Sequence, residues 1–185
     1  MRTLVGFGAS SMQGTGDSQG GFFSRLERSG ALPNTKFINA GKGGNTTRDM
    51  LARAGELAAH RPYDLVVMLG CNDLPRDGDV SPHVERRVPL AEYGQNLAAI
   101  LPAIRGERSL FISSFLMSPA KGMRPETFEQ YMTVAISLAK ENGYEVWDFY
   151  RESLGYISTH WANDGVHMKD SGHELVAKEL AVRLK

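Results

Sequence analysis

Short apolar segments alternate with longer segments of helical periodicity along this chain, and the alternation predicts a three-layer α/β fold with a parallel sheet. One apolar segment, residues 65–69, reads Leu-Val-Val-Met-Leu, which is typical of a strand covered on both faces. The 185 residues, 42% hydrophobic and 23% charged, have the length and composition of one globular domain. We therefore expect a single α/β domain over residues 1–185, and the pattern itself leaves the order of the strands open.

The individual elements follow from hydrophobic periodicity and from turn signals. Five strands are predicted, over residues 3–7, 36–39, 65–69, 110–115 and 145–149. Five helices are predicted, over residues 21–29, 46–59, 90–104, 125–142 and 171–184. Ser171 and Glu174 have the spacing of a capping box, so we expect the last helix to begin there.

Charge, cysteine content and the first residues exclude several classes of protein. Lys and Arg number 21, as do Asp and Glu, so no basic surplus points to a nucleic-acid partner. Cys71 is the only cysteine, which excludes an internal disulfide and a cysteine-rich zinc cluster. The apolar stretch after Met1 is too short for a secretory signal, and no segment approaches the roughly 20 apolar residues of a membrane span. We expect a cytoplasmic protein.

Glycine-containing or polar segments follow the predicted strands at the ends where α/β proteins place their sites. Ser10 follows the first strand, the segment 39–46 contains three glycines, and Asn72 and Asp73 follow the third strand. After the last strand and a polar stretch comes the segment 164–167, Asp-Gly-Val-His. We expect these segments to converge on one edge of the sheet.

This set of residue types is what acyl transfer requires. A serine hydroxyl needs a base such as neutral histidine to take its proton, and the histidine needs an acceptor that fixes its tautomer. The oxyanion of the tetrahedral intermediate needs hydrogen-bond donors, which glycine-turn N–H groups and an asparagine amide can supply. An aspartate three residues before a histidine, in a turn that contains glycine, can fold back onto the imidazole ring.

Four short blocks in this order resemble those of the SGNH (GDSL-like) hydrolase family, and the resemblance covers nearly the whole chain. The blocks are Gly8-Ala9-Ser10-Ser11, Gly41-Lys42-Gly43-Gly44, Gly70-Cys71-Asn72-Asp73 and Asp164-Gly165-Val166-His167. The chain departs from the family's usual Gly-Asp-Ser in the first block, where Ala9 replaces the aspartate. That aspartate is not a triad member, so the change affects local hydrogen bonding more than the chemistry.

The resemblance implies a role for each matched residue. Ser10 is the expected nucleophile, His167 the base and Asp164 the acid that orients it. The N–H groups of Ser10 and Gly44 and the amide of Asn72 are the expected oxyanion-hole donors. The resemblance also implies the flavodoxin-like strand order 2-1-3-4-5 and a hydrolase that needs no metal or other cofactor.

Two other serines compete with Ser10 for the role of nucleophile. Ser11 is one residue further into the same turn. Ser18 lies in a literal Gly-Asp-Ser string, but it is well past the strand end and no apolar segment precedes it. We therefore expect Ser18 in a loop beside the site, as a turn or cap residue.

The sequence thus favours a serine esterase or lipase that hydrolyses small acyl esters through an acyl-enzyme intermediate. Alternatives within the class are a thioesterase, a lysophospholipase and a carbohydrate O-acetylesterase. Outside the class, a non-catalytic binding module keeps the fold without the activity, and a nucleotide-binding domain is disfavoured because no Gly-Lys-Ser/Thr motif is present. The natural substrate and the oligomeric state are left open.

The segment from Leu74 to Pro89 is a long connection, and loops of this length are usually functional. It contains Arg76, Arg86 and Arg87, which could attract an anionic substrate. Charges in a loop are more often simply solvated, so the sequence favours that interpretation.

Overall fold

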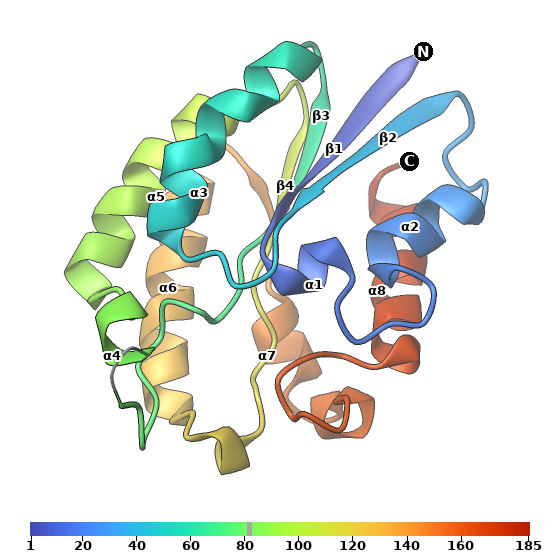
Figure 1. Ribbon diagram of the computed structural model, residues 1–185. Helices are drawn as coiled ribbons and strands as arrows, with labels where there is room; N and C mark the ends of the chain where they lie inside the picture. The colour runs from blue at the N-terminus through green and yellow to red at the C-terminus, as the bar shows by residue number, and fades with distance from the viewer. Residues whose placement is uncertain (81–82) are drawn as a thin grey trace.

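A parallel sheet of five strands forms the middle layer of the protein (Figure 1). The computed structural model describes residues 1–80 and 83–185. The strands are β1 (Arg2–Gly8), β2 (Thr35–Gly41), β3 (Asp64–Met68), β4 (Ser109–Ile112) and β5 (Glu145–Trp147). Their order in the sheet is β2-β1-β3-β4-β5, with every neighbouring pair parallel. The fold class and the strand order implied by the family resemblance are confirmed.

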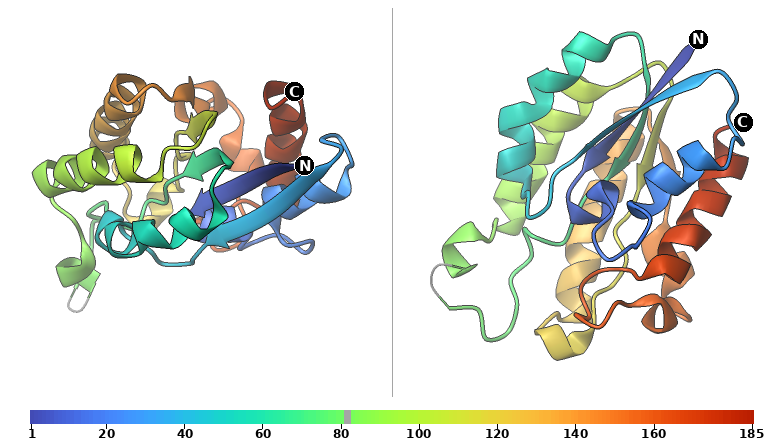
Figure 2. Two further views of the ribbon diagram at one scale, coloured as in Figure 1. Left: turned by 90° about the horizontal axis from the view of Figure 1, so that it is seen from above. Right: turned by 45° about the vertical axis from the view of Figure 1, so that its right-hand side comes forward.

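Helices cover both faces of this sheet (Figure 2). One face carries α1 (Ser10–Gln13), α2 (Gly21–Arg28) and α8 (Asp170–Arg183), and the other carries α3 (Thr47–Arg53), α5 (Leu90–Ile104) and α6 (Pro125–Glu141). The shorter helices are α4 (His83–Arg86), α7 (Phe149–Ser153) and three 3-10 segments, Ala54–His60, Pro119–Lys121 and Ile157–His160. None of the helices within the described ranges has both the length and the hydrophobicity to cross a membrane.

The two faces of the sheet bury alternate residues of each strand. In β3, Val66 and Met68 pack with the core under α2 and α8, whereas Leu65 and Val67 pack with the core under α5 and α6. This division follows from the two-residue period of a strand. It explains why β3 has no polar residue between 65 and 69, because both of its faces are covered by helices.

Two predicted helices differ from the observed ones. The predicted helix over 46–59 is interrupted, since α3 ends at Arg53 and a 3-10 segment continues to His60. The capping box at Ser171 was wrong, because α8 begins one residue earlier and its N-cap residue, Lys169, makes no side-chain cap. Instead, the Ser171 hydroxyl contacts Nδ1 of His160 at 2.9 Å and Glu174 pairs with Lys178 at 2.6 Å.

The first three strands in the sheet end at the same level. Gly8 lies opposite Gly41 of β2 and opposite Met68 of β3. The loops that follow these strands therefore leave the sheet side by side at its carboxyl edge. The long connection 74–89 begins at this edge and contains α4, while its residues 81 and 82 lie outside the described part of the chain.

Candidate active site

Ser10 is the first residue of α1, directly after a tight turn that follows β1. The turn requires glycine at position 8, because a Cβ there would collide with the carbonyl oxygen of Met68 on the neighbouring strand. N–H groups in the first turn of a helix have no acceptor within the helix, so the N–H of Ser10 is free to bind a ligand oxygen. Within the described residues, the Ser10 hydroxyl makes no hydrogen bond.

The glycine loop after β2 passes beside Ser10. The N–H of Gly43 donates to Oε1 of Gln13 at 2.7 Å, and a Cβ on Gly43 would lie 4.0 Å from the Cβ of Ser10. Gly44 follows with φ of +75°, a conformation that favours glycine. The loop is thus held against α1 through Gly43, and Gly44 is the next residue.

Asn72, after β3, is held by the same glycine loop. Its side-chain amide donates one hydrogen bond, from Nδ2 to the carbonyl oxygen of Asn45 at 2.9 Å. An asparagine amide carries two N–H groups, so a second donor is available to a ligand. Cys71 beside it is buried as a free thiol, and burial raises the pKa of that thiol.

A buried arginine links the end of β1 to the glycine loop. Arg53 at the end of α3 donates from Nη2 to the carbonyl oxygen of Gly8 at 2.9 Å and from Nε to Oδ1 of Asn45 at 2.6 Å. Its guanidinium group also lies 4.3 Å from the centre of the Phe7 ring. This contact could not be predicted from the sequence, because an arginine near the end of a helix is ordinarily a surface charge.

Asp164 and His167 form a direct pair. Nδ1 of His167 lies 2.6 Å from Oδ2 of Asp164, and Oδ1 of Asp164 accepts the N–H groups of Val166 and His167 at 2.8 and 2.9 Å. Burial alone would raise the pKa of Asp164, but the hydrogen bonds from the His167 side chain and from these two N–H groups outweigh it and lower the pKa to about 2. The ionised carboxylate can only accept, so Nδ1 carries the proton and Nε2 of a neutral ring is left as the acceptor.

The loop that follows α1 packs on this pair. A Cβ on Gly16 would lie 3.0 Å from the Cβ of His167 and would collide with the carbonyl oxygen of Met168. The structure therefore brings Asp164 into contact with His167, and the loops of Gly44 and Asn72 against the turn of Ser10. Across the described ranges it shows no hydrogen bond between Ser10 and His167, and such contacts are often long in a ligand-free site.

Ser18 occupies a different environment from that of Ser10. It is exposed, and both its N–H and its hydroxyl donate to the carboxylate of Asp170, at 2.9 and 2.5 Å. The nearby His173 is fully buried, with Nδ1 accepting the N–H of Phe22 at 3.2 Å and Nε2 3.1 Å from the carbonyl oxygen of Thr15. Both ring nitrogens of His173 are therefore occupied by backbone groups, which leaves this histidine unavailable as a base for Ser18.

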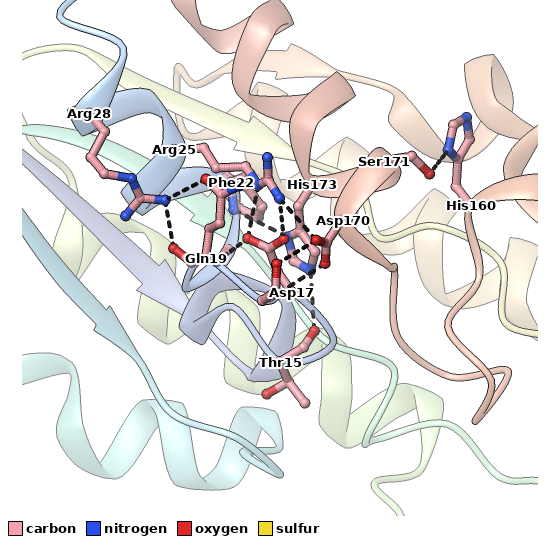
Figure 3. Close-up of polar contacts among 12 residues, drawn as sticks. Thr15, Asp17, Gln19, Phe22, Arg25, Arg28, His160, Asp170, Ser171 and His173 are labelled. Atoms are coloured by element: carbon pink, nitrogen blue, oxygen red, sulfur yellow. Dashed lines mark hydrogen bonds and ion pairs between the residues drawn. The ribbon is translucent and has the colours of Figure 1, made fainter.

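Four side chains around Ser18 form what we name the clasp: Asp17, Arg25, Asp170 and His173 (Figure 3). The Asp17 carboxylate accepts the N–H of Gly21 at 2.8 Å and two hydrogen bonds from Arg25, at 2.9 and 2.6 Å. Burial alone would raise the pKa of Asp17, but its contacts with Arg25 and Gly21 outweigh that effect and lower the pKa to about 2. The clasp fastens the loop between α1 and α2 to α8.

The sheet order and the loops at its carboxyl edge are those of an ester-hydrolysing α/β enzyme. The chain belongs to the GDSL-like lipase/acylhydrolase family, whose family model matches residues 6–175. An acetylxylan esterase of Geobacillus stearothermophilus is 28% identical over 152 residues, which are 77% of this chain and 69% of that protein.

Solved structures show the same fold. A lipase/acylhydrolase from Enterococcus faecalis superposes with a TM-score of 0.82 at 24% identity, covering 99% of this chain and 97% of the other. The acetylxylan esterase Axe2 from Geobacillus stearothermophilus superposes with a TM-score of 0.80 at 23% identity, covering 99% and 94%. At these identities the likeness concerns the fold.

Proposed function

We propose that residues 1–185 form one catalytic domain, a serine esterase that hydrolyses small acyl esters through an acyl-enzyme intermediate. The observation that carries the proposal is the Asp164–His167 pair, whose ring presents a free Nε2 beside the loop that follows Ser10. The family membership supports an ester as the substrate. Two solved structures of Axe2 are described as catalytic mutants, one with a serine and one with a histidine replaced by alanine, which supports the same pair of residue types here.

In the proposed mechanism, Oγ of Ser10 attacks the carbonyl carbon of the ester while Nε2 of His167 takes the hydroxyl proton. The oxyanion of the tetrahedral intermediate accepts hydrogen bonds from the N–H groups of Ser10 and Gly44 and from the side-chain amide of Asn72. Collapse of the intermediate breaks the bond to the alcohol oxygen, which leaves with the proton held by His167. A water molecule then repeats the sequence on the acyl-enzyme and releases the acid and free Ser10.

Asp164 supports this sequence electrostatically. Because its pKa is about 2, it remains ionised at neutral pH and stabilises the imidazolium that forms at each proton transfer. Its bond to Nδ1 also fixes the ring so that Nε2 is the atom that exchanges the proton.

A carbohydrate O-acetylesterase is the second candidate for the substrate class, and the acetylxylan esterase relative favours it. Thioesterase and lysophospholipase activities remain alternatives from the sequence. Initial rates separate these candidate activities when they are measured on acetylated oligosaccharides, on p-nitrophenyl esters of increasing chain length and on the matching thioesters.

Hydrolysis of p-nitrophenyl acetate by Ser10→Ala tests the central assignment. We expect kcat to fall by about 10³-fold or more, because removing a nucleophile leaves only the oxyanion hole and binding to act. Ser18→Ala is the matched control and should retain activity, since the Ser18 hydroxyl is bonded to Asp170. Covalent labelling by a fluorophosphonate probe should be lost in Ser10→Ala alone. Wild-type rates in Ser10→Ala, or an inactive Ser18→Ala, would contradict the proposal.

A further inference from the structure

A small cavity adjoins two of the proposed oxyanion-hole residues. Its volume is about 180 Å³, and it is lined by Gly44, Thr46, Asn72, Arg76, Arg86 and Arg87. Pockets that enclose a whole drug-sized ligand are larger, about 300–1,000 Å³, so this cavity suits one small group of a substrate. Because three arginines line the cavity, a negatively charged group fits it best.

One of the three arginines is neutralised within the protein. Arg87 donates from Nε and Nη2 to the carboxylate of Asp79, at 2.8 and 2.9 Å, and from Nη1 to the carbonyl oxygen of Asn72 at 2.8 Å. Both side chains of this ion pair are largely buried. Arg87 therefore fixes the backbone that carries Asn72, with its charge balanced by Asp79.

The other two arginines have no ion pair among the residues that the structure describes. To the described residues, the Arg86 side chain donates one hydrogen bond, from Nη2 to the carbonyl oxygen of Gly44 at 3.3 Å. Nε of Arg76 is buried and has no hydrogen-bond partner within residues 1–80 and 83–185. Arg76 also lines the cavity, so its guanidinium group stands at the cavity wall with at least one donor that has no internal partner in the described part of the chain.

The carboxylates beside the lining residues are already engaged. Asp79, the partner of Arg87, also accepts the N–H of Arg76 at 2.9 Å. Asp49 accepts from the N–H and the hydroxyl of Thr46, at 2.8 and 2.9 Å, and Asp73 accepts from the N–H and the hydroxyl of Thr47, at 2.8 and 2.6 Å. Neither compensates the guanidinium groups of Arg76 and Arg86 by direct contact. The cavity thus keeps a positive charge beside the proposed reaction centre.

We propose that this cavity is an anion subsite, in which Arg76 and Arg86 bind a carboxylate carried by the ester substrate. The proposal rests on the proposed esterase function and narrows its substrate class to esters with a negatively charged group near the reacting carbonyl. A guanidinium fork matches a carboxylate by paired, charge-assisted hydrogen bonds. The carboxylate can belong to the acyl part, as in a monoester of a dicarboxylic acid, or to the alcohol part, as in an acetylated uronic acid.

Paired substrates test the subsite. For the acyl part, the p-nitrophenyl monoester of glutaric acid is compared with p-nitrophenyl pentanoate; for the alcohol part, an acetylated uronic acid is compared with the acetylated neutral sugar. Reactions with Ser10→Ala provide the blank for spontaneous hydrolysis. We expect kcat/KM to favour the anionic member of at least one pair, and the pair that shows it identifies which part of the substrate carries the charge.

Arg76→Gln and Arg86→Gln should reduce the ratio of anionic to neutral kcat/KM by about tenfold each, the usual loss when one charged hydrogen-bond partner is removed. Arg124→Gln is the matched control, because Arg124 is exposed, pairs with Asp77 and does not line the cavity, so the ratio should not change. The subsite would be overturned if the variants lost kcat/KM equally on the anionic and the neutral substrate of a pair. It would also be overturned if the wild type hydrolysed neutral esters without preferring the anionic ones. Neither result would contradict the proposed esterase function.

Calorimetric titration with glutarate tests the subsite without catalysis. We expect glutarate to bind the wild type, and its Kd to rise about tenfold in Arg76→Gln. This result would support the subsite even if no ester were hydrolysed, and in that case only the proposed esterase function would fail. Equal affinity in the wild type and Arg76→Gln, or no binding to either, would overturn the subsite.

Discussion

Asp164 holds His167 through one short stretch of chain, since its two oxygens accept a ring N–H and two backbone N–H groups from the next three residues. Gly165, with φ of +65°, lets the chain fold back so tightly. The orientation of the imidazole ring is therefore a local property of residues 164–167, fixed before any substrate binds.

Asp164→Asn should reduce kcat on p-nitrophenyl acetate by about 10⁴-fold, with a smaller effect on KM. The asparagine amide can present an N–H to Nδ1, which stabilises the wrong tautomer of His167 and removes the negative charge beside the imidazolium. Steady-state kinetics measure the effect. Asp77→Asn, an exposed loop aspartate whose partner is Arg124, serves as control and should behave like the wild type.

The loop between α1 and α2 shows how elements are joined around the site. The clasp fastens this loop to α2 through Asp17 and Arg25 and to α8 through Asp170 and His173. The same loop packs on His167 at Gly16. Contacts made some distance from the proposed chemistry thus support the backbone on which the proposed base rests.

Arg25→Gln should lower the free energy of unfolding by about 3 kcal/mol, because it leaves the buried Asp17 carboxylate without its charged partner. Denaturant titration measures this change, and kcat should fall as well because the loop at Gly16 loosens. Arg151→Gln is the matched control, since the Arg151–Glu129 pair is exposed at the surface and its loss should leave stability unchanged. An equal free energy of unfolding in Arg25→Gln and the wild type would show that the clasp does not stabilise the fold.

The sequence predicted the elements well where packing alone decides them. The apolar segment 65–69 was predicted as a strand covered on both faces and is observed as β3, Asp64–Met68, and residues 90–104 became α5 with the predicted bounds. Helix ends were less predictable: Glu174 has the spacing of a capping box, but it pairs with Lys178, and this competition cannot be read from spacing.

The segments of the site could be predicted from the motif blocks, whereas the groups that support them could not. Arg53 carries no local signal, because its partner, Gly8, lies 45 residues earlier in the chain and meets it only through the tertiary fold. The assignment of Ser10 as nucleophile stays a prediction until the variant is assayed.

Across the whole molecule, the pH dependence of stability follows from carboxylates with shifted pKa values. Asp17 and Asp164 have pKa values of about 2, below the ordinary value of 3.8, so each favours the folded state above about pH 4. This contribution is lost as the pH falls through the folded-state values. Asp73, whose pKa burial raises to about 6, acts in the opposite direction and lowers stability as the pH rises from about 4 to about 6.

We expect the free energy of unfolding to decrease as the pH is lowered from about 4 to about 2, with Asp17 contributing about 2 kcal/mol of the change. Denaturant titrations at a series of pH values measure it. In Asp17→Asn the decrease should be smaller by that amount, whereas Asp77→Asn should follow the wild-type curve. A wild-type stability that does not change over this range would contradict the assignment.

The clasp lies where parts of the chain that are made at very different times meet, since its Asp170 binds Ser18, which lies 152 residues earlier in the chain. Synthesis proceeds from the N-terminus, so Ser10 emerges early and His167 late. A nascent chain therefore carries the proposed nucleophile long before it carries the base that would activate it. If Ser10 and His167 act as we propose, a chain that ends before residue 164 lacks the base and should not hydrolyse esters.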